Sequence, residues 1–203
     1  MKSSMVIVYP VHSGLYINLT NRCPCACTFC IRQKDEGVHG SDSLWLEHEP
    51  DFEEVKKALE AADFSSYSEI VFCGYGEPTE AFEVLKQTAA FVKKNSRLPV
   101  RLNTNGLGNL INKRNIVPEM NGLIDRLSVS LNSSDAATYE KIVRPAFAEK
   151  SYPALLDFIK EAKKYISDIT LTTVSSTISA QDEEACKKFS DELGVSFRAR
   201  AFA

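Results

Sequence analysis

The sequence lacks a long hydrophobic run. The apolar stretch nearest its start, Met5 to Val8, is four residues long, whereas a membrane helix needs about 20 apolar residues and a signal-peptide core about 7 to 15. We therefore expect neither a membrane segment nor an export signal. Their absence favours a cytoplasmic location, where thiols stay reduced.

The sequence also has no excess of positive charge. The 203 residues carry a formal net charge of −3 and give a pI near 5.7. This balance does not indicate the broad basic surface that binds nucleic-acid phosphates, although it leaves a local basic cleft open.

No internal repeat and no linker rich in glycine, serine or proline divides the chain. With 44% hydrophobic residues, the chain is able to bury one sizeable core. A chain of this length usually forms one domain. We expect a single domain over residues 1–203.

Histidine is scarce, with only three in the chain, His12, His39 and His48. All three fall in predicted loops, and none has a carboxylate or cysteine at a spacing typical of a metal site. We expect these histidines at the surface.

Cysteine is dense in one place. Four of the six cysteines lie within the eight residues 23–30, in "NRCPCACTFC". In a reducing compartment such a cluster is more typical of metal ligands or redox centres than of disulfides. The remaining two, Cys73 and Cys186, are expected to pack as small hydrophobic side chains.

Short β-branched runs alternate with amphipathic stretches along the whole chain. The predicted strands are 15–20, 69–74, 99–105, 126–132, 169–176 and 196–202. This alternation indicates parallel strands joined by right-handed crossovers, in an open doubly wound sheet or a barrel. A full eight-stranded barrel takes about 250 residues, so a barrel here is limited to a partial one of six strands.

Three helices are predicted, at 51–62, 79–94 and 181–193. Asp51 and Glu54 form a capping box for the first. Ser179 is placed to cap the third, and Gly194 follows its end. The connections 106–125 and 133–168 are expected to be partly helical, with the second broken around Arg144-Pro145 and Pro153.

Polar and glycine-rich residues follow the predicted strands. The cysteine segment follows the first strand, "CGYGEP" closes the second, "NTNG" the third and "SLNSS" the fourth. The C-terminal ends of parallel strands lie at one edge, so these segments are expected to form one active rim. Pro78 holds Glu77 extended, so we expect the Glu77 amide and carbonyl to face outward.

The spacing of the cysteines suggests three ligands and one bystander. Cys23, Cys27 and Cys30 form C-x3-C-x2-C, and Cys25 is expected to point differently if the segment is extended. Four thiolates would complete a zinc or iron–sulfur site. Three thiolates on a four-iron cluster would leave one iron open to a substrate or cofactor.

These motifs resemble those of the radical S-adenosylmethionine (SAM) superfamily. C-x3-C-x2-C with Phe29 before its last cysteine is similar to the superfamily signature. "GYGEP" is similar to its glycine-glycine-glutamate-proline motif, with Tyr75 in place of a glycine, and "NTNG" and "SVSLN" are similar to segments that touch the ribose of SAM. The strand pattern agrees with the superfamily's partial (β/α)6 barrel. The segment "NLTNRCPCACTFCIR" is most similar to the TatD-associated radical SAM proteins.

The resemblance implies a [4Fe–4S] cluster on Cys23, Cys27 and Cys30, with SAM bound to the fourth iron. An external one-electron reductant of the flavodoxin or ferredoxin kind would drive cleavage of SAM to a 5′-deoxyadenosyl radical, which takes hydrogen from a substrate. The resemblance leaves the substrate unspecified, and a macromolecule stays open.

The resemblance also implies SAM contacts at eight positions. Phe29 would place backbone against the adenine, and Gly74, Gly76 and Glu77 would receive the methionyl amine, mainly through main-chain groups. Asn103, Ser130 and Asn132 would contact the ribose, and Arg144 is a candidate for the SAM carboxylate. Tyr75 departs from the motif, and its side chain is a candidate to point outward.

Two readings without SAM chemistry stay open from the residues alone. Cys23, Cys25, Cys27 and Cys30 could hold zinc in a binding module, or the cluster could serve an electron carrier. The long connection 31–50, which contains Trp45, could be either a lid over the cofactor or an ordinary hairpin.

Overall fold

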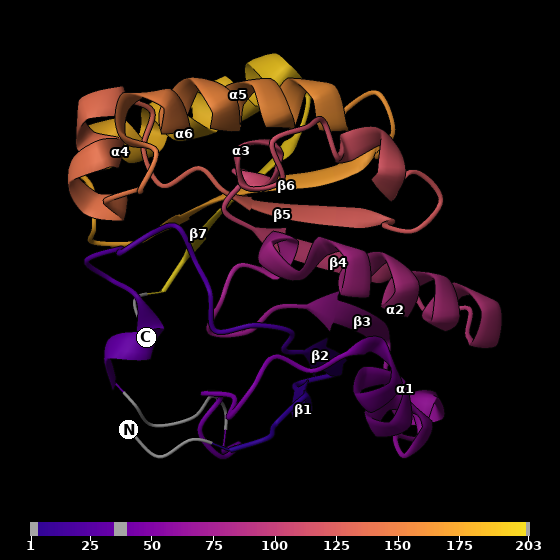
Figure 1. Cartoon of the computed structure of the whole chain (residues 1–203). Coiled ribbons are helices and arrows are strands. Elements are labelled where there is room, and N and C mark those ends of the chain that lie inside the picture. Colours follow the sequence, from indigo (N-terminus) through magenta and orange to yellow (C-terminus); the bar gives the residue numbers. More distant parts are fainter. Residues whose placement is uncertain (1–3, 35–39, 202–203) are drawn as a thin grey trace.

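The computed structural model, which describes residues 4–34 and 40–201, contains one seven-stranded sheet in the order β1-β2-β3-β4-β5-β6-β7 (Figure 1). The strands are β1 (Val8–Val11), β2 (Gly14–Ile17), β3 (Glu69–Phe72), β4 (Val100–Thr104), β5 (Arg126–Ser130), β6 (Asp168–Val174) and β7 (Ser196–Arg200). All neighbours from β2 to β7 pair in parallel, while β1 pairs antiparallel with β2. The α/β partial barrel of six parallel strands is confirmed, and β1 is an addition to it.

The missed strand β1 has a physical explanation. It is four residues long and contains Pro10, and a proline inside a short apolar run argues against a strand in the interior of a sheet. At the edge of a sheet, however, a backbone amide that faces away from the neighbouring strand has no partner strand to bond, so Pro10 is tolerated in β1. The tight turn into β2 uses His12 at a positive φ of 51°.

Helices cover one face of the sheet (Figure 1). The α-helices are α1 (Phe52–Glu60), α2 (Phe82–Asn95), α3 (Gly108–Ile111), α4 (Ala136–Val143), α5 (Ser151–Ala162) and α6 (Ala180–Leu193). Short 3-10 helices are η1 (Ile31–Lys34), η2 (Phe64–Ser66), η3 (Pro78–Ala81), η4 (Val117–Met120) and η5 (Ala148–Lys150). The main core lies between the sheet and these helices.

Side chains alternate between the two faces of each strand. Leu102, Leu127 and Leu171 pack in the main core, together with the partly buried Phe197 of β7. Their strand neighbours project from the opposite face, which we call the inner face. Figure 1 shows this face turned away from α1–α6.

The predicted helix signals are largely confirmed. Asp51 and Glu54 form the capping box of α1. Ser179 accepts a hydrogen bond at the start of α6, and Gly194 ends that helix in the left-handed region. The predicted break at Pro153 is wrong, because Pro153 lies in the first turn of α5, where a backbone amide has no intrahelical acceptor.

Other expectations concern the surface. His12 and His48 are exposed, as predicted, while His39 and Phe202 lie outside the described residues. Within the described chain, every helix is too short or too polar to cross a bilayer.

Candidate functional site

The cysteine segment leaves the end of β2 and docks on the chain around the end of α4. The Ala26 amide donates to the carbonyl of Val143 at 3.1 Å, and the Thr28 amide donates to that of Ile142 at 2.8 Å. Cys25 forms an isolated antiparallel bridge with Pro145. A segment with little regular structure is thereby held at the C-terminal edge of the sheet.

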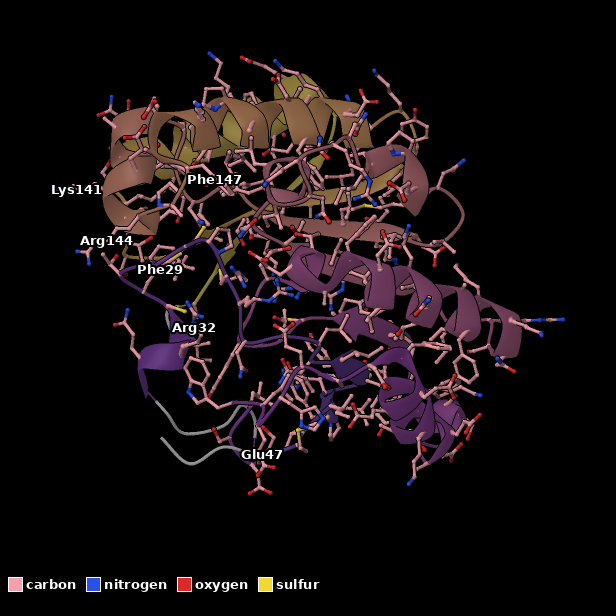
Figure 2. All side chains as sticks on the ribbon, in the orientation of Figure 1. Phe29, Arg32, Glu47, Lys141, Arg144 and Phe147 are labelled. Carbon is pink, nitrogen blue, oxygen red and sulfur yellow. The ribbon has the colours of Figure 1, made fainter. Side chains whose placement is uncertain are left out.

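Arg144 makes this docking possible through its backbone. It ends α4 in the left-handed region at φ 50°, which turns the chain back along the cysteine segment. Its carbonyl accepts from the Ala26 amide at 3.3 Å. The Arg144 side chain is exposed and extends outward (Figure 2). The structure therefore supports a positioning role for its backbone.

Three of the four clustered sulfurs lie together, with Cys25 in the middle. Cys25 Sγ and Cys23 Sγ lie 3.6 and 3.9 Å from the same atom, Asn105 Nδ2, and the thiols of Cys23 and Cys27 both raise the pKa of Cys25. Cys25 therefore does not point differently from Cys23 and Cys27, as was expected of an extended segment, while its role as a bystander stays a prediction. The bridge to Pro145 turns its side chain inward, and Cys25 is buried while Cys23, Cys27 and Cys30 are half-buried.

The pKa values of the three neighbouring thiols shift in different directions. The hydrogen bond from Cys25 lowers the pKa of Cys23 and that of Cys27, although burial opposes both shifts. The same bonds, together with burial, raise the pKa of Cys25. Cys23 and Cys27 are thus more disposed to ionise than Cys25, and thiolates are the form that binds metal.

Two polar side chains contact the sulfurs. Arg32 Nε lies 3.4 Å from Cys30 Sγ, and its Nη2 donates to the Cys25 carbonyl at 3.1 Å. Asn105 Nδ2 lies 3.6 Å from Cys25 Sγ and 3.9 Å from Cys23 Sγ. Arg32 lies at the same corner of the molecule as Phe29 (Figure 2).

Phe29 is half-buried and packs against the main core. Its ring therefore anchors the cysteine segment, and the backbone role implied for it stays a prediction.

The glycines of "GYGEP" allow the ends of β2 and β3 to approach closely. A Cβ on Gly74 would lie 2.0 Å from Asn18 Oδ1, and one on Gly76 would lie 2.2 Å from the Thr20 carbonyl oxygen and 2.6 Å from that of Arg22. The absence of a side chain at position 76 thus keeps the chain that enters the cysteine segment against β3.

Tyr75 does not point outward. It is buried in a second hydrophobic cluster on Tyr9, Val11 and Leu44, and its ring centroid lies 5.3 Å from that of Trp45. The described part of the 31–50 connection is not a hairpin, since it contains only η1 and extended chain. It packs its aromatic side chain on the glycine-rich loop.

The buried Glu77 side chain links the loop after β3 to the end of β4 by hydrogen bonds. Its carboxylate accepts from Thr104 Oγ1 and the Asn105 amide, both at 2.7 Å, and from Thr79 Oγ1 at 2.8 Å. Burial raises the pKa of Glu77, while these donors act in the opposite direction.

The Glu77 backbone does not face outward as expected. Its amide donates to the Arg22 carbonyl at 2.8 Å, and its own carbonyl accepts from the Glu80 amide at 3.0 Å. The turn of η3 after Pro78 folds these groups inward. Both main-chain groups are therefore used within the protein.

The predicted ribose residues occupy different environments. Asn103 projects from the inner face, where its Oδ1 accepts from Arg101 Nη1 at 2.9 Å, so it lies below the rim. Ser130 is the half-buried last residue of β5. Asn132 is buried in the left-handed region at φ 63°, and its Oδ1 has no hydrogen-bond partner in the described structure.

A cavity of about 610 Å³ opens beside this rim, between the loops after β5 and β6, one side of α4 and the start of α6. Its lining includes Ser134, Ile178 and Asp182. Asp182 accepts from Ser133 Oγ at 2.7 Å and from the Ser134 amide at 2.8 Å. This carboxylate fixes the loop after β5 at the cavity wall.

Within residues 4–34 and 40–201, no group of three or more His, Cys, Asp and Glu side chains has the arrangement of a metal centre. The donor set is nevertheless sulfur-rich, with two thiols disposed to ionise and a guanidinium beside a third. Thiolates of this kind are the usual ligands of iron–sulfur clusters, so the residues fit such a group.

The sequence matches the Radical SAM superfamily over residues 17–189. The chain belongs to this superfamily, whose members bind a [4Fe–4S] cluster and SAM. A search of curated proteins finds no significant match.

Solved structures share the fold at low sequence identity. SuiB of Streptococcus suis, bound to precursor peptide SuiA, has a TM-score of 0.69 and 17% identity, with 94% of this chain and 39% of SuiB covered. A radical SAM methyltransferase from Sphaerobacter thermophilus has a TM-score of 0.59 and 16% identity, with 96% and 57% covered. The protein anSMEcpe with bound AdoMet has a TM-score of 0.60 and 17% identity, with 93% and 50% covered. The chain thus spans between 39% and 57% of these proteins.

Sequence reasoning missed three residues that shape the site: Arg32, Asn105 and Asp182. Asn105 had a usable signal, since residues 103 and 105 of "NTNG" lie two apart and the later one is nearer the C-terminal edge. Arg32 follows the last clustered cysteine by two positions. The contacts that Asp182 makes with Ser133 and Ser134 had no local signal, because those residues lie in the loop after β5.

We expect Gly76→Ala to destabilise the protein by about 2 kcal/mol or more, because its Cβ would overlap backbone oxygens that have little room to move. Urea unfolding followed by circular dichroism measures the loss. Gly122→Ala is the control, since Gly122 has a positive φ but its added Cβ would meet no atom of the described residues within 4 Å, and its cost of about 1 kcal/mol is backbone strain alone. Equal losses would contradict the close-contact explanation.

We expect Glu77→Ala to cost at least about 2 kcal/mol in the same measurement, because it leaves buried donors on Thr79, Thr104 and Asn105 without an acceptor. Glu83→Ala is the matched control. Glu83 is an exposed carboxylate in surface ion pairs, so its removal costs less than about 1 kcal/mol. A Glu77 variant as stable as the Glu83 variant would show that the hydrogen bonds of the Glu77 carboxylate do not stabilise the protein.

Proposed function

We propose that this chain is the SAM-cleaving domain of a radical enzyme, with Cys23, Cys27 and Cys30 as the ligands of a [4Fe–4S] cluster. The observation that carries the proposal is the gathering of the clustered cysteines at the C-terminal edge of a parallel sheet, where the glycine-rich loop and the ends of β4 and β5 also lie. This edge is where enzymes of such folds hold their ligands.

The chain's own residues set the environment of the sulfurs. Arg32 places a positive charge beside Cys30, and the amide of Asn105 lies beside Cys23. Hydrogen bonds and nearby charge tune the potential of thiolate-bound clusters. The buried Cys25 thiol lies beside Cys23, as their shared neighbour Asn105 shows, so in this proposal it supports the ligands without replacing them.

SAM would lie between the cysteine segment and the cavity beside β5 and β6. The buried Asn132 Oδ1 lacks a donor in the described structure, and a ribose hydroxyl is a suitable donor for it. With the Glu77 backbone already bonded, the loop carbonyls of Gly74 and Gly76 are the remaining main-chain candidates for the methionyl amine.

A [4Fe–4S] cluster held by Cys23, Cys27 and Cys30 would, once reduced, supply the electron for cleavage of SAM to methionine and a 5′-deoxyadenosyl radical, and that radical would take hydrogen from the substrate. The electron would come from an external flavodoxin-like or ferredoxin-like donor. The surrounding residues position the cofactors and limit access of water to them. Trp45 and Tyr75 pack together over the glycine-rich loop, where they would shield that side.

The first test is formation of 5′-deoxyadenosine. Protein reconstituted anaerobically with iron and sulfide should become brown and, with dithionite and SAM, release 5′-deoxyadenosine that chromatography detects. A colourless protein that holds one zinc ion would support the zinc-binding module instead. A full cluster without any 5′-deoxyadenosine would support an electron carrier.

The second test separates the four cysteines. We expect Cys23→Ala, Cys27→Ala and Cys30→Ala each to lose most of the bound iron and at least about tenfold in SAM cleavage, because loss of a ligand reduces metal affinity and activity. Cys25→Ala should retain iron. Iron analysis and the absorption of the cluster measure the difference. Loss of iron in Cys25→Ala alone would show that Cys25 is a ligand.

A further inference from the structure

The edge strand β7 places two arginines on the inner face of the sheet. Arg198 pairs with Thr172 and Arg200 pairs with Val174 across the β6–β7 ladder. Phe197, between them and the strand start, packs into the main core. Alternation therefore directs Arg198 and Arg200 to the opposite face.

Because β7 is parallel to its neighbour, its C-terminal end lies at the same edge of the sheet as the cysteine segment. Figure 1 shows the end of β7 approaching the part of the chain that carries the cysteines. Arg200 is the last residue of this strand. Its side chain is therefore placed on the inner face beside the proposed SAM site.

The arginines at the two ends of the inner face differ in their partners. At the far end, Arg101 forms an ion pair with Glu69 at 2.7 Å, and Arg126 forms one with Asp168 at 3.0 Å. Arg198 and Arg200 form no side-chain hydrogen bond or ion pair with any residue that the structure describes. Their charges are thus left uncompensated within the described chain.

Arg200 is accessible to water and yet surrounded by protein. Its side chain is exposed, but desolvation lowers its pKa, and the charges of Arg198 and Arg101 lower it further. The thiol of Cys73 and the hydroxyl of Tyr16 act on it in the opposite direction. Tyr16 lies on β2 and Cys73 directly follows β3, so Arg200 faces across the inner face and not away from it.

We propose that Arg198 and Arg200 bind an anionic oxyacid group of the substrate, a carboxylate or a phosphate, and hold it on the inner face beside SAM. That the bound group belongs to a substrate rests on the proposed function, whereas the anion site itself rests on the two arginines alone. A guanidinium binds such a group with two parallel hydrogen bonds. An anion here would also relieve the repulsion between neighbouring cationic groups.

The site is tested by calorimetric titration of the reconstituted protein at low ionic strength with inorganic phosphate and, separately, with succinate. We expect saturable binding of at least one probe, and the tighter probe identifies the source of the anion. The double variant Arg198→Gln/Arg200→Gln should weaken that binding at least tenfold. Arg126→Gln removes the same charge from the far end of the same face and should change the affinity less than twofold.

Two further measurements distinguish the geometry of the guanidinium from its charge, and loss of the anion site from loss of SAM binding. Arg200→Lys keeps the charge but loses the planar fork, so its binding should be intermediate, and it serves if the double variant does not fold. The dissociation constant for SAM should stay within twofold in every variant. Binding that is not saturable, or that survives in the double variant, overturns the proposal, as does a parallel loss of SAM affinity.

These outcomes are independent of the SAM-cleavage test. Anion binding that depends on Arg198 and Arg200 would stand even if the protein released no 5′-deoxyadenosine. Conversely, SAM cleavage with no anion binding would leave the proposed function intact and refute the anion site.

Discussion

The structure depends on the tie between the chain that enters the cysteine segment and the ends of β3 and β4. The Glu77 amide binds the Arg22 carbonyl, and the Glu77 carboxylate binds the ends of the next strand through Thr104 and Asn105. Gly76 permits this because the backbone of Thr20 lies where a side chain would begin. A buried carboxylate is costly unless its hydrogen bonds are made, so the tie has little freedom to rearrange.

A second contact holds the other side of the cysteine segment. The left-handed turn at Arg144 exposes carbonyls at the end of α4, and the amides of Ala26 and Thr28 bind there. The cysteines are thus held between the loop after β3 and the end of α4, where Glu77 and Val143 make the two attachments. Such a double attachment can hold sulfur ligands in place without regular structure in the segment itself, which is what a pre-organised cofactor site requires.

The sequence allowed the parallel strands and the capped helices to be predicted, because periodicity and caps act over a few residues. Asp51, Ser179 and Gly194 are examples. Contacts between distant segments were beyond reach. Cys25 points inward because of its bridge to Pro145, and Tyr75 is buried because Trp45 packs on it. Neither partner is near in sequence, so local geometry gave the wrong direction for both side chains.

The strand order of the sheet explains why arginines are paired with carboxylates at one end of the inner face and unpaired at the other, among the described residues. Each arginine at the N-terminal end of the strands has a carboxylate on an adjacent strand, as Arg126 has Asp168. At the C-terminal end, β7 pairs with β6 alone among the strands of the described residues, and the positions opposite Arg198 and Arg200 are Thr172 and Val174. An ion pair across that ladder cannot form, because neither residue carries a charge. Among the described residues, the charge that the sheet leaves uncompensated therefore lies toward the edge where cofactor and substrate would meet, and a ligand is the natural counterion for it.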